Sequence, residues 1–146
     1  MKFGGFLHLN IRCGASDLPA IEKFYGEVLG LKKGSRPNFR FGGMWLYDGD
    51  DPIIHVSARF AEGSIARNDQ HSGSVDHIAF KASGAADFRK HLKKLGIVFQ
   101  EQNIANAGYQ VFLRDPVATK LEFNFLDEVV PDAVPTGTTA QSNLVT

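Results

Sequence analysis

The chain has 146 residues, of which 43% are hydrophobic, so it is long enough for one well-buried domain but short for two independent ones. Basic and acidic residues number 16 each, and this balance argues against nucleic acid or an anionic membrane as a partner. The single cysteine, the absence of a signal-peptide pattern and the absence of an apolar run of roughly 20 residues predict a soluble, cytoplasmic protein.

The first half of the chain predicts a strand, a helix and three further strands. Phe6–Arg12 alternates in polarity, which places His8, Asn10 and Arg12 on one face of a strand. Leu18–Leu29 carries apolar residues at helical spacing, with Asp17 and Pro19 at its start and Gly30 at its end. Short strands are expected at 31–33, Met44–Tyr47 and Ile53–Ser57, joined by turns rich in aspartate and glycine.

The second half repeats this order after a polar, glycine-containing stretch at 60–74 that suits a linker. The pattern predicts a strand, a helix and three strands at Val75–Lys81, Ala85–Leu95, Ile97–Gln102, Tyr109–Arg114 and Lys120–Phe125. Residues 127–146 hold few large apolar groups and are expected to form a flexible C-terminal tail.

The two halves also agree in register. His77 follows His8 by 69 residues, Gly96 follows Gly30 by 66, and Glu122 follows His55 by 67. A duplicated βαβββ module explains these separations, with module one at 6–59, the linker at 60–74 and module two at 75–126. We therefore expect a single α+β domain, 1–126, in which two paired modules form a curved mixed-sheet cup.

Four equivalent positions of the repeat carry possible metal ligands, namely His8, His55, His77 and Glu122. A histidine or glutamate taken alone is more often packed or solvated, but the coincidence of all four under one repeat favours a metal site. Imidazole and carboxylate suit several divalent ions, so Fe, Zn, Ni, Mn and Co are not distinguished. His71 and His91 lie in polar surroundings and are expected to be solvated.

The segments HLNIRCGASDLPAIEKFYGEVLGL, WLYDGDDPIIHV, DHIAF and FLRDPVATKLEFNF resemble the vicinal oxygen chelate superfamily, which contains glyoxalases, bleomycin-resistance proteins and extradiol dioxygenases. The likeness covers about residues 6–126 and is greatest to small glyoxalase-like bacterial members. It implies that His8, His77 and Glu122 bind one divalent metal. Enzymes similar to glyoxalase I commonly have a glutamate ligand at the position of His55. His55 is therefore expected to act as a fourth ligand or as a base. Members of the superfamily usually have a glycine at the position of Ala118. The turn at Asp115–Ala118 is therefore expected to form, but with a changed backbone.

Strand parity selects further residues for the cup. We expect Asn10 and Arg12 beside His8, Ser57 beside His55, and Gln110 and Phe112 opposite Glu122, with Trp45 and Tyr47 as an aromatic wall or as ordinary core. Arg36, Arg40 and Arg114 are weaker candidates for receiving a substrate carboxylate.

Several functions are compatible with this cup. The leading hypothesis is a glyoxalase-like isomerase or lyase in which the metal grips two neighbouring substrate oxygens and Glu122 or His55 moves a proton. The alternatives are an Fe(II) extradiol-type dioxygenase, a metal-free protein that sequesters a drug or other ligand, and a scaffold without catalysis. We expect a small-molecule substrate that binds as an anion, and a homodimer.

Overall fold

The computed structural model describes residue 1 and residues 5–60, 75–105 and 108–133 of the chain. These residues belong to two compact units, one of residues 1–70 with 115–118, and one of 71–114 with 119–146. The expected linker, apart from Phe60, and His71 lie outside the described residues. Neither described helix has the length and apolar character needed to cross a membrane.

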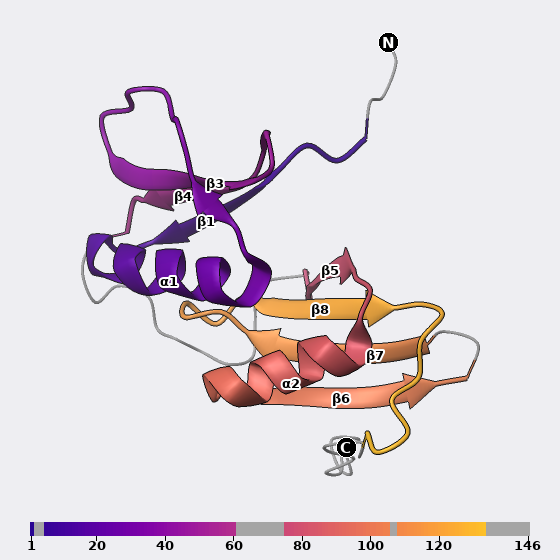
Figure 1. Cartoon of the computed structure of the whole chain (residues 1–146). Coiled ribbons are helices and arrows are strands. Elements are labelled where there is room, and N and C mark those ends of the chain that lie inside the picture. The colour runs from indigo at the N-terminus through magenta and orange to yellow at the C-terminus, as the bar shows by residue number, and fades with distance from the viewer. Residues whose placement is uncertain (2–4, 61–74, 106–107, 134–146) are drawn as a thin grey trace, which may run out of the picture. The chain divides into compact units, whose positions relative to one another are not determined.

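The first unit is a βαβββ module (Figure 1). Its elements are β1 (Leu9–Cys13), a 3-10 turn (Ala15–Asp17), α1 (Leu18–Leu29), β2 (Lys32–Lys33), β3 (Gly42–Asp48) and β4 (Asp51–Ala58). The strands form one sheet in the order β1-β4-β3-β2, in which β1 runs parallel to β4 and the other neighbours are antiparallel.

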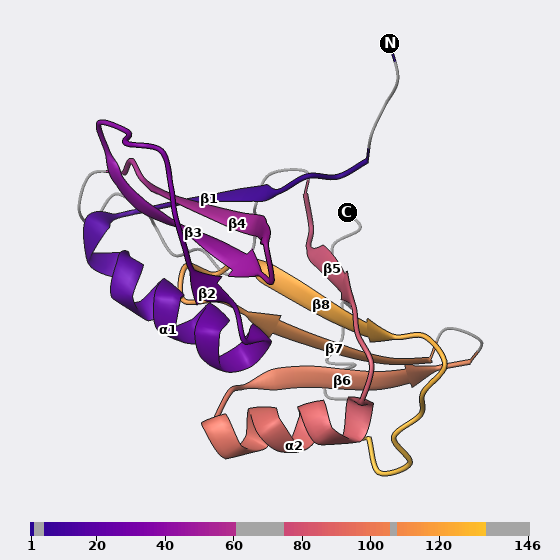
Figure 2. The same ribbon diagram turned by 45° about the horizontal axis from the view of Figure 1, so that its top comes forward.

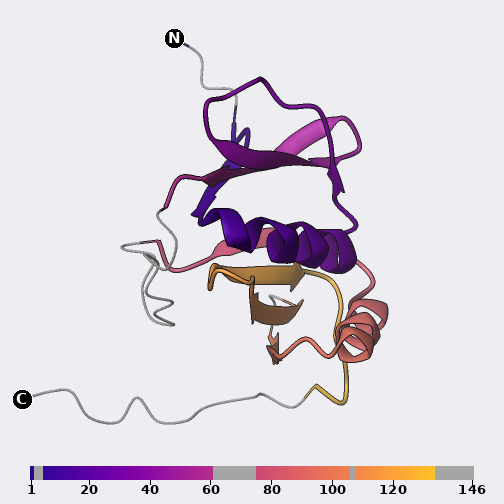
Figure 3. The ribbon, with the colours of Figure 1, turned by 90° about the vertical axis from the view of Figure 1, so that its left-hand side faces the viewer.

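Helix α1 covers one face of this sheet, and the opposite face is left for the candidate site (Figures 2 and 3). The core of the first unit is formed by alternate strand residues and by the apolar stripe of α1, chiefly Ile11, Cys13, Ile21, Tyr25, Val28, Met44, Leu46, Ile54 and Val56. The helix ends at Gly30, whose φ of 73° is left-handed and suits glycine.

The second unit repeats the module with β5 (Ile78–Lys81), α2 (Ala85–Leu95), β6 (Phe99–Ile104), β7 (Gly108–Arg114) and β8 (Lys120–Phe125). The sheet order is β5-β8-β7-β6, with β5 parallel to β8, so the two sheets have equivalent topologies. Phe88 of α2 contacts the rings of Phe123 and Phe125 and thereby fixes which face of the sheet is apolar. The chain is therefore an α+β protein of two paired βαβββ modules.

Strands β1 and β5 each begin three residues later than the polarity pattern predicts. The ladder between β1 and β4 starts at Leu9 with Ile54, and Phe6 and Leu7 before it are 82% and 81% exposed. The strand expected from Val75 likewise begins at Ile78. Alternation of polarity does not make a strand where the partner strand supplies no ladder, so His8 and His77 lie just before β1 and β5.

Residues 127–133, expected to belong to the flexible tail, make specific contacts within the second unit, although only Val130 among them is buried. Val130 is 6% exposed, and its backbone N–H donates to Asn103 Oδ1 while its carbonyl accepts from Asn103 Nδ2. Glu128 accepts hydrogen bonds from the backbone N–H groups of Gly84 and Ala85, both at 2.7 Å, and so holds the start of α2. A few polar contacts order this segment although it has little apolar content.

The turn Asp115–Ala118 forms as expected, and Ala118 keeps the left-handed backbone that a glycine would adopt there. Ala118 N–H donates to the Asp115 carbonyl at 3.0 Å, and Ala118 has a φ of 68°, in the left-handed region that favours glycine. Asp115 is buried and accepts a hydrogen bond from the Tyr25 hydroxyl at 3.0 Å, which ties the turn to α1 within the first unit.

Candidate metal and substrate site

His8, His55 and Trp45 form a stack of three rings in the first unit. The centroids of His8 and His55 are 3.8 Å apart, and those of His55 and Trp45 are 3.9 Å apart with nearly parallel planes. The register explains the second contact, because Trp45 lies directly opposite His55 in the β3–β4 ladder. The stack places two imidazoles side by side, with a half-buried indole covering the second.

The surroundings of His55 favour its neutral form. Burial lowers its pKa most, the charge of a protonated His8 lowers it further, and a backbone hydrogen bond at Pro52 opposes both. Its Nε2 atom is buried and has no hydrogen-bond partner within the described part of the chain. A neutral imidazole with an unused nitrogen can bind a metal ion or accept a proton.

The other predicted residues of the first unit line the same face. Asn10 pairs with His55 and Arg12 with Ser57 in the β1–β4 ladder. The Asn10 amide exchanges hydrogen bonds with the Ser57 hydroxyl at 3.1 and 3.0 Å, and the Arg12 guanidinium lies 4.4 Å from the centre of the Phe60 ring. Strand parity therefore predicted the face on which these side chains lie.

Trp45 and Tyr47 do not play equivalent parts. Trp45 stacks on His55, whereas the Tyr47 hydroxyl donates to the Ser35 carbonyl at 2.7 Å. Of the expected aromatic wall, only Trp45 makes a ring contact with a candidate ligand among the residues with a described position.

His77 and Glu122 meet in the second unit. His77 Nε2 lies 2.7 Å from Glu122 Oε2, and Glu122 is only 6% exposed. On the other side of the ring, His77 Nδ1 lies 2.7 Å from Asp76 Oδ2, which also accepts a hydrogen bond from Lys120 Nζ at 2.8 Å. The hydrogen bonds from Lys120 and His77 lower the pKa of Asp76 to about 2.

This arrangement sets a requirement on His77. Its two ring nitrogens each face a carboxylate oxygen, but a neutral imidazole has only one N–H to donate. With Asp76 accepting the Nδ1 proton, the contact between Nε2 and Glu122 is favourable only if a second proton or a metal cation lies between them. A carboxylate behind a histidine is also the usual orienting partner of a metal-binding imidazole.

Further residues surround this pair. The register places Phe112 opposite Glu122 and Gln110 opposite Asn124, and the ring of Phe112 meets that of His77 edge-on at 5.8 Å. Gln110 accepts a hydrogen bond from Gln102. Three neighbours of this pair were not predicted, namely Asp76, Lys120 and Asn124. The Asn124 amide donates a hydrogen bond to Glu122 Oε1 at 3.2 Å. The acid immediately before His77 was the one signal in the sequence that could have indicated Asp76.

Comparisons with solved structures identify the fold. A glyoxalase family protein from Bacillus anthracis is 20% identical with a TM-score of 0.66, and the match covers 89% of this chain and 98% of that one. An integron cassette protein from Vibrio cholerae is 25% identical, with a TM-score of 0.61 and coverages of 85% and 96%. FosX from Listeria monocytogenes, in complex with Mn(II) and 1S,2S-dihydroxypropylphosphonic acid, is 13% identical, with a TM-score of 0.64 and coverages of 84% and 92%.

The chain has the vicinal oxygen chelate fold. No protein-family model matches its sequence, and no significant relative is found among curated proteins. The fold is thus recognised through three-dimensional similarity and through the motifs quoted above, at identities too low to carry an activity over.

Within this vicinal oxygen chelate fold, the four predicted ligands fall into two pairs. His8 stacks on His55 in the first unit, and His77 contacts Glu122 in the second. No group of three or more histidine, cysteine, aspartate or glutamate side chains is gathered around one point among the residues whose placement is described. Each pair nevertheless fits a divalent cation chemically, through the unpartnered Nε2 of His55 and through the buried carboxylate of Glu122.

Proposed function

We propose that the chain is a metal-dependent enzyme of glyoxalase type, an isomerase or lyase that holds a small substrate through two neighbouring oxygens. His8, His77 and Glu122 are the proposed protein ligands, and His55 is a fourth ligand or a base. The observation that carries the proposal is the 2.7 Å contact between His77 Nε2 and Glu122 Oε2, with Asp76 on the far side of the ring.

The residues around this contact are suited to holding a cation. Asp76 fixes the Nδ1–H tautomer of His77 and leaves the Nε2 lone pair for a ligand bond. Glu122 is buried on β8 opposite Phe112, where an uncompensated carboxylate is costly. A bound divalent ion compensates this charge and acts as a Lewis acid toward negative charge that develops on the substrate oxygens.

His55 is the proposed proton carrier if it is not a ligand. Its neutral form and its buried, unpartnered Nε2 allow it to accept a proton from the substrate and return it to another atom. Trp45 lies against one face of the imidazole and His8 against the other, so the ring is held in one orientation. A fixed ring favours transfer along one direction.

The charge of the proposed site favours an anionic substrate. Three neutral imidazoles and one carboxylate around a divalent ion give a net charge of about +1. Arg12, on the same sheet face as Asn10, adds a second positive charge. Catechols or hydroxyketo acids should therefore bind more tightly than their neutral methyl ethers or esters.

Metal content tests the proposal directly. The protein is purified without added metal and analysed for bound elements, alongside the variants His8→Ala, His77→Ala and Glu122→Gln, with His91→Ala as a control at an exposed histidine of α2. We expect near-stoichiometric metal in the native chain and in the control, and loss of at least nine-tenths of it in the three ligand variants. Full occupancy in any one of them would remove that residue from the ligand set.

Two further results separate the remaining possibilities. His55→Ala retains the metal if His55 is a base and loses affinity for it if His55 is a ligand. Bound iron with oxygen-dependent cleavage of a catechol would replace the isomerase or lyase proposal by a dioxygenase. Metal-free native protein that cannot be loaded would overturn both.

A further inference from the structure

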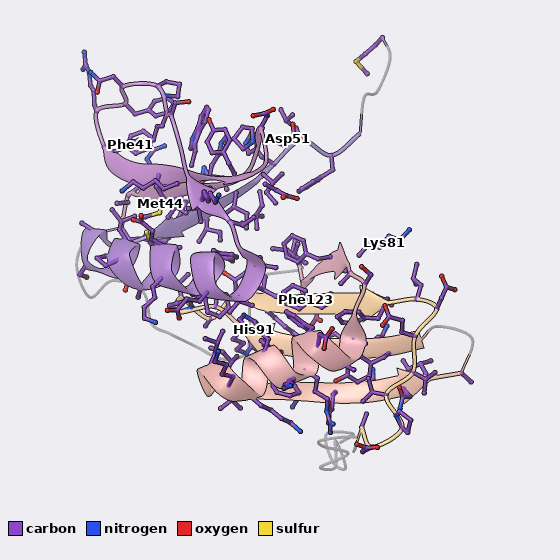
Figure 4. All side chains as sticks on the ribbon, viewed as in Figure 1. Phe41, Met44, Asp51, Lys81, His91 and Phe123 are labelled. Carbon is purple, nitrogen blue, oxygen red and sulfur yellow. The ribbon has the colours of Figure 1, made fainter. Side chains whose placement is uncertain are left out.

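The open face of the first sheet continues past the histidines as a run of aromatic rings. Side chains alternate along β3, so Phe41, just before the strand, and Trp45 lie on the face away from α1, whereas Met44 points toward α1 (Figure 4). Ring centroids of Trp45 and Phe39 are 6.4 Å apart, and those of Phe39 and Phe41 are 5.2 Å apart. The rings extend from the stack of His8, His55 and Trp45 to Phe41.

Two guanidinium groups lie at the far end of this run. The Cζ atoms of Arg36 and Arg59 are 5.3 and 5.0 Å from the centre of the same Phe41 ring, and Arg36 is also 4.9 Å from the centre of Phe39. Arg36 Nη2 donates to the Phe41 carbonyl at 2.9 Å, which fixes its position. Arg59 immediately follows β4, and its contact with Phe41 places its guanidinium beside this run of rings.

These two cations have no carboxylate partner within ion-pair distance in the part of the chain that the structure describes. Contact with the face of an aromatic ring uses the charge of a guanidinium but not its N–H groups. Both groups therefore keep N–H donors for an anion, and a guanidinium whose position is restricted by ring contacts loses less side-chain freedom when it binds an oxyanion.

We infer that Arg36 and Arg59 bind the carboxylate or phosphate group of a planar aromatic acid whose ring lies along Phe39 and Trp45. The inference deepens the proposed function, because the ring run ends at His8 and His55, where the reacting end of the substrate would lie. The rings of Trp45, Phe39 and Phe41 separate His55 from Arg59, so the site suits an elongated molecule with its anion distant from the reacting oxygens.

Trp45 is the only tryptophan of the chain, so its fluorescence reports binding on this face. The full chain is stripped of metal with a chelator and titrated with 3-phenylpropanoate, 2-phenylethyl phosphate and the neutral 3-phenylpropanamide. The anions should bind at least ten-fold more tightly than the amide, and added salt should weaken this preference. The difference between the two anions tells which oxyanion the guanidinium pair takes.

Matched variants identify the residues responsible. Arg36→Gln and Arg59→Gln should each lower the preference for the acid at least three-fold, and Arg36→Lys should keep part of it. Lys32→Gln, which changes an exposed lysine of β2, should leave it unchanged. Equal binding of acid and amide, or an equal loss in Lys32→Gln, would overturn the inference. Because these titrations use metal-free protein and probes without neighbouring oxygens, they stand or fall separately from the proposed metal chemistry.

Discussion

Glu101 is the residue whose replacement should most clearly reveal what holds the second module together. It is 7% exposed and receives two hydrogen bonds from Arg89, at 2.7 and 2.9 Å, and one from the buried hydroxyl of Tyr109. Burial alone would raise its pKa, but the hydrogen bonds from Arg89 and Tyr109 outweigh burial and hold it below the ordinary value. Burial and the hydrogen bond to Glu101 raise the pKa of Tyr109, and the charge of Arg89 opposes them.

We expect Glu101→Gln to lower the free energy of unfolding at pH 7 by about 3 kcal/mol, because it leaves a mostly buried guanidinium with only the exposed carboxylate of Asp132, 3.9 Å away, as a counter-charge. The Arg89 side chain is 16% exposed and also donates to the Asp132 carbonyl at 3.0 Å, so water and this contact keep the loss at the lower end of the usual range. For a domain of this size the loss corresponds to a fall in Tm of roughly 10 °C.

The difference between native chain and variant should depend on pH. A carboxyl whose pKa is depressed by folding adds stability above its unfolded-state pKa of about 4.3, and this contribution is lost as the pH falls through the lower folded-state value. Urea unfolding followed by circular dichroism at pH 7 and pH 3 measures both differences, and the second should be less than half of the first.

Glu27→Gln provides the control, because Glu27 forms an exposed ion pair with Lys23 one helical turn away and should change stability by less than about 0.5 kcal/mol. A cost of less than 1 kcal/mol, or an equal cost at both pH values, would refute the conclusion that a buried ion pair between Glu101 and Arg89 stabilises the second module.

Other regions of the chain give further tests. Ala118→Gly should raise the free energy of unfolding by about 0.5 kcal/mol, because the steric strain removed from the left-handed backbone exceeds the entropic cost of adding a glycine to the unfolded chain. A lower Tm in thermal unfolding would contradict this. Glu128→Gln should cost about 1 kcal/mol by weakening the two hydrogen bonds at the start of α2, and an unchanged urea midpoint would show that residues 127–133 do not support that helix. Light scattering at micromolar concentration should give the mass of a homodimer. Related folds pair their modules within or between chains, and this chain exposes the apolar side chains of Phe6 and Leu7. A single species with the monomer mass of 16.0 kDa would refute this prediction.

The sequence by itself determined the local structure and the repeat. Both helices begin and end where the apolar spacing, the proline in the first turn and the terminal glycines place them, because these signals act over a few neighbouring residues. Period-two alternation likewise separated the helix-facing residues from Asn10, Ser57 and Phe112. It overextended β1 and β5, since a strand ends where its partner no longer supplies hydrogen bonds, and the sequence of one strand does not contain that information.

Only the tertiary structure decided which side chains meet. The stacking of Trp45 on His55, the carboxylate of Asp76 behind His77 and the guanidinium groups on Phe41 depend on sheet register and on loop paths, which bring together residues distant in sequence. The burial of Glu101 was likewise not predictable from sequence, because its polar character predicts an exposed position on β6. Hydrogen bonds from Arg89 and Tyr109 make its burial favourable. Electrostatic and ring contacts of this kind depend on how the folded sheets place distant residues. The polarity of a single residue therefore predicts the face on which its side chain lies but not the partner that it contacts.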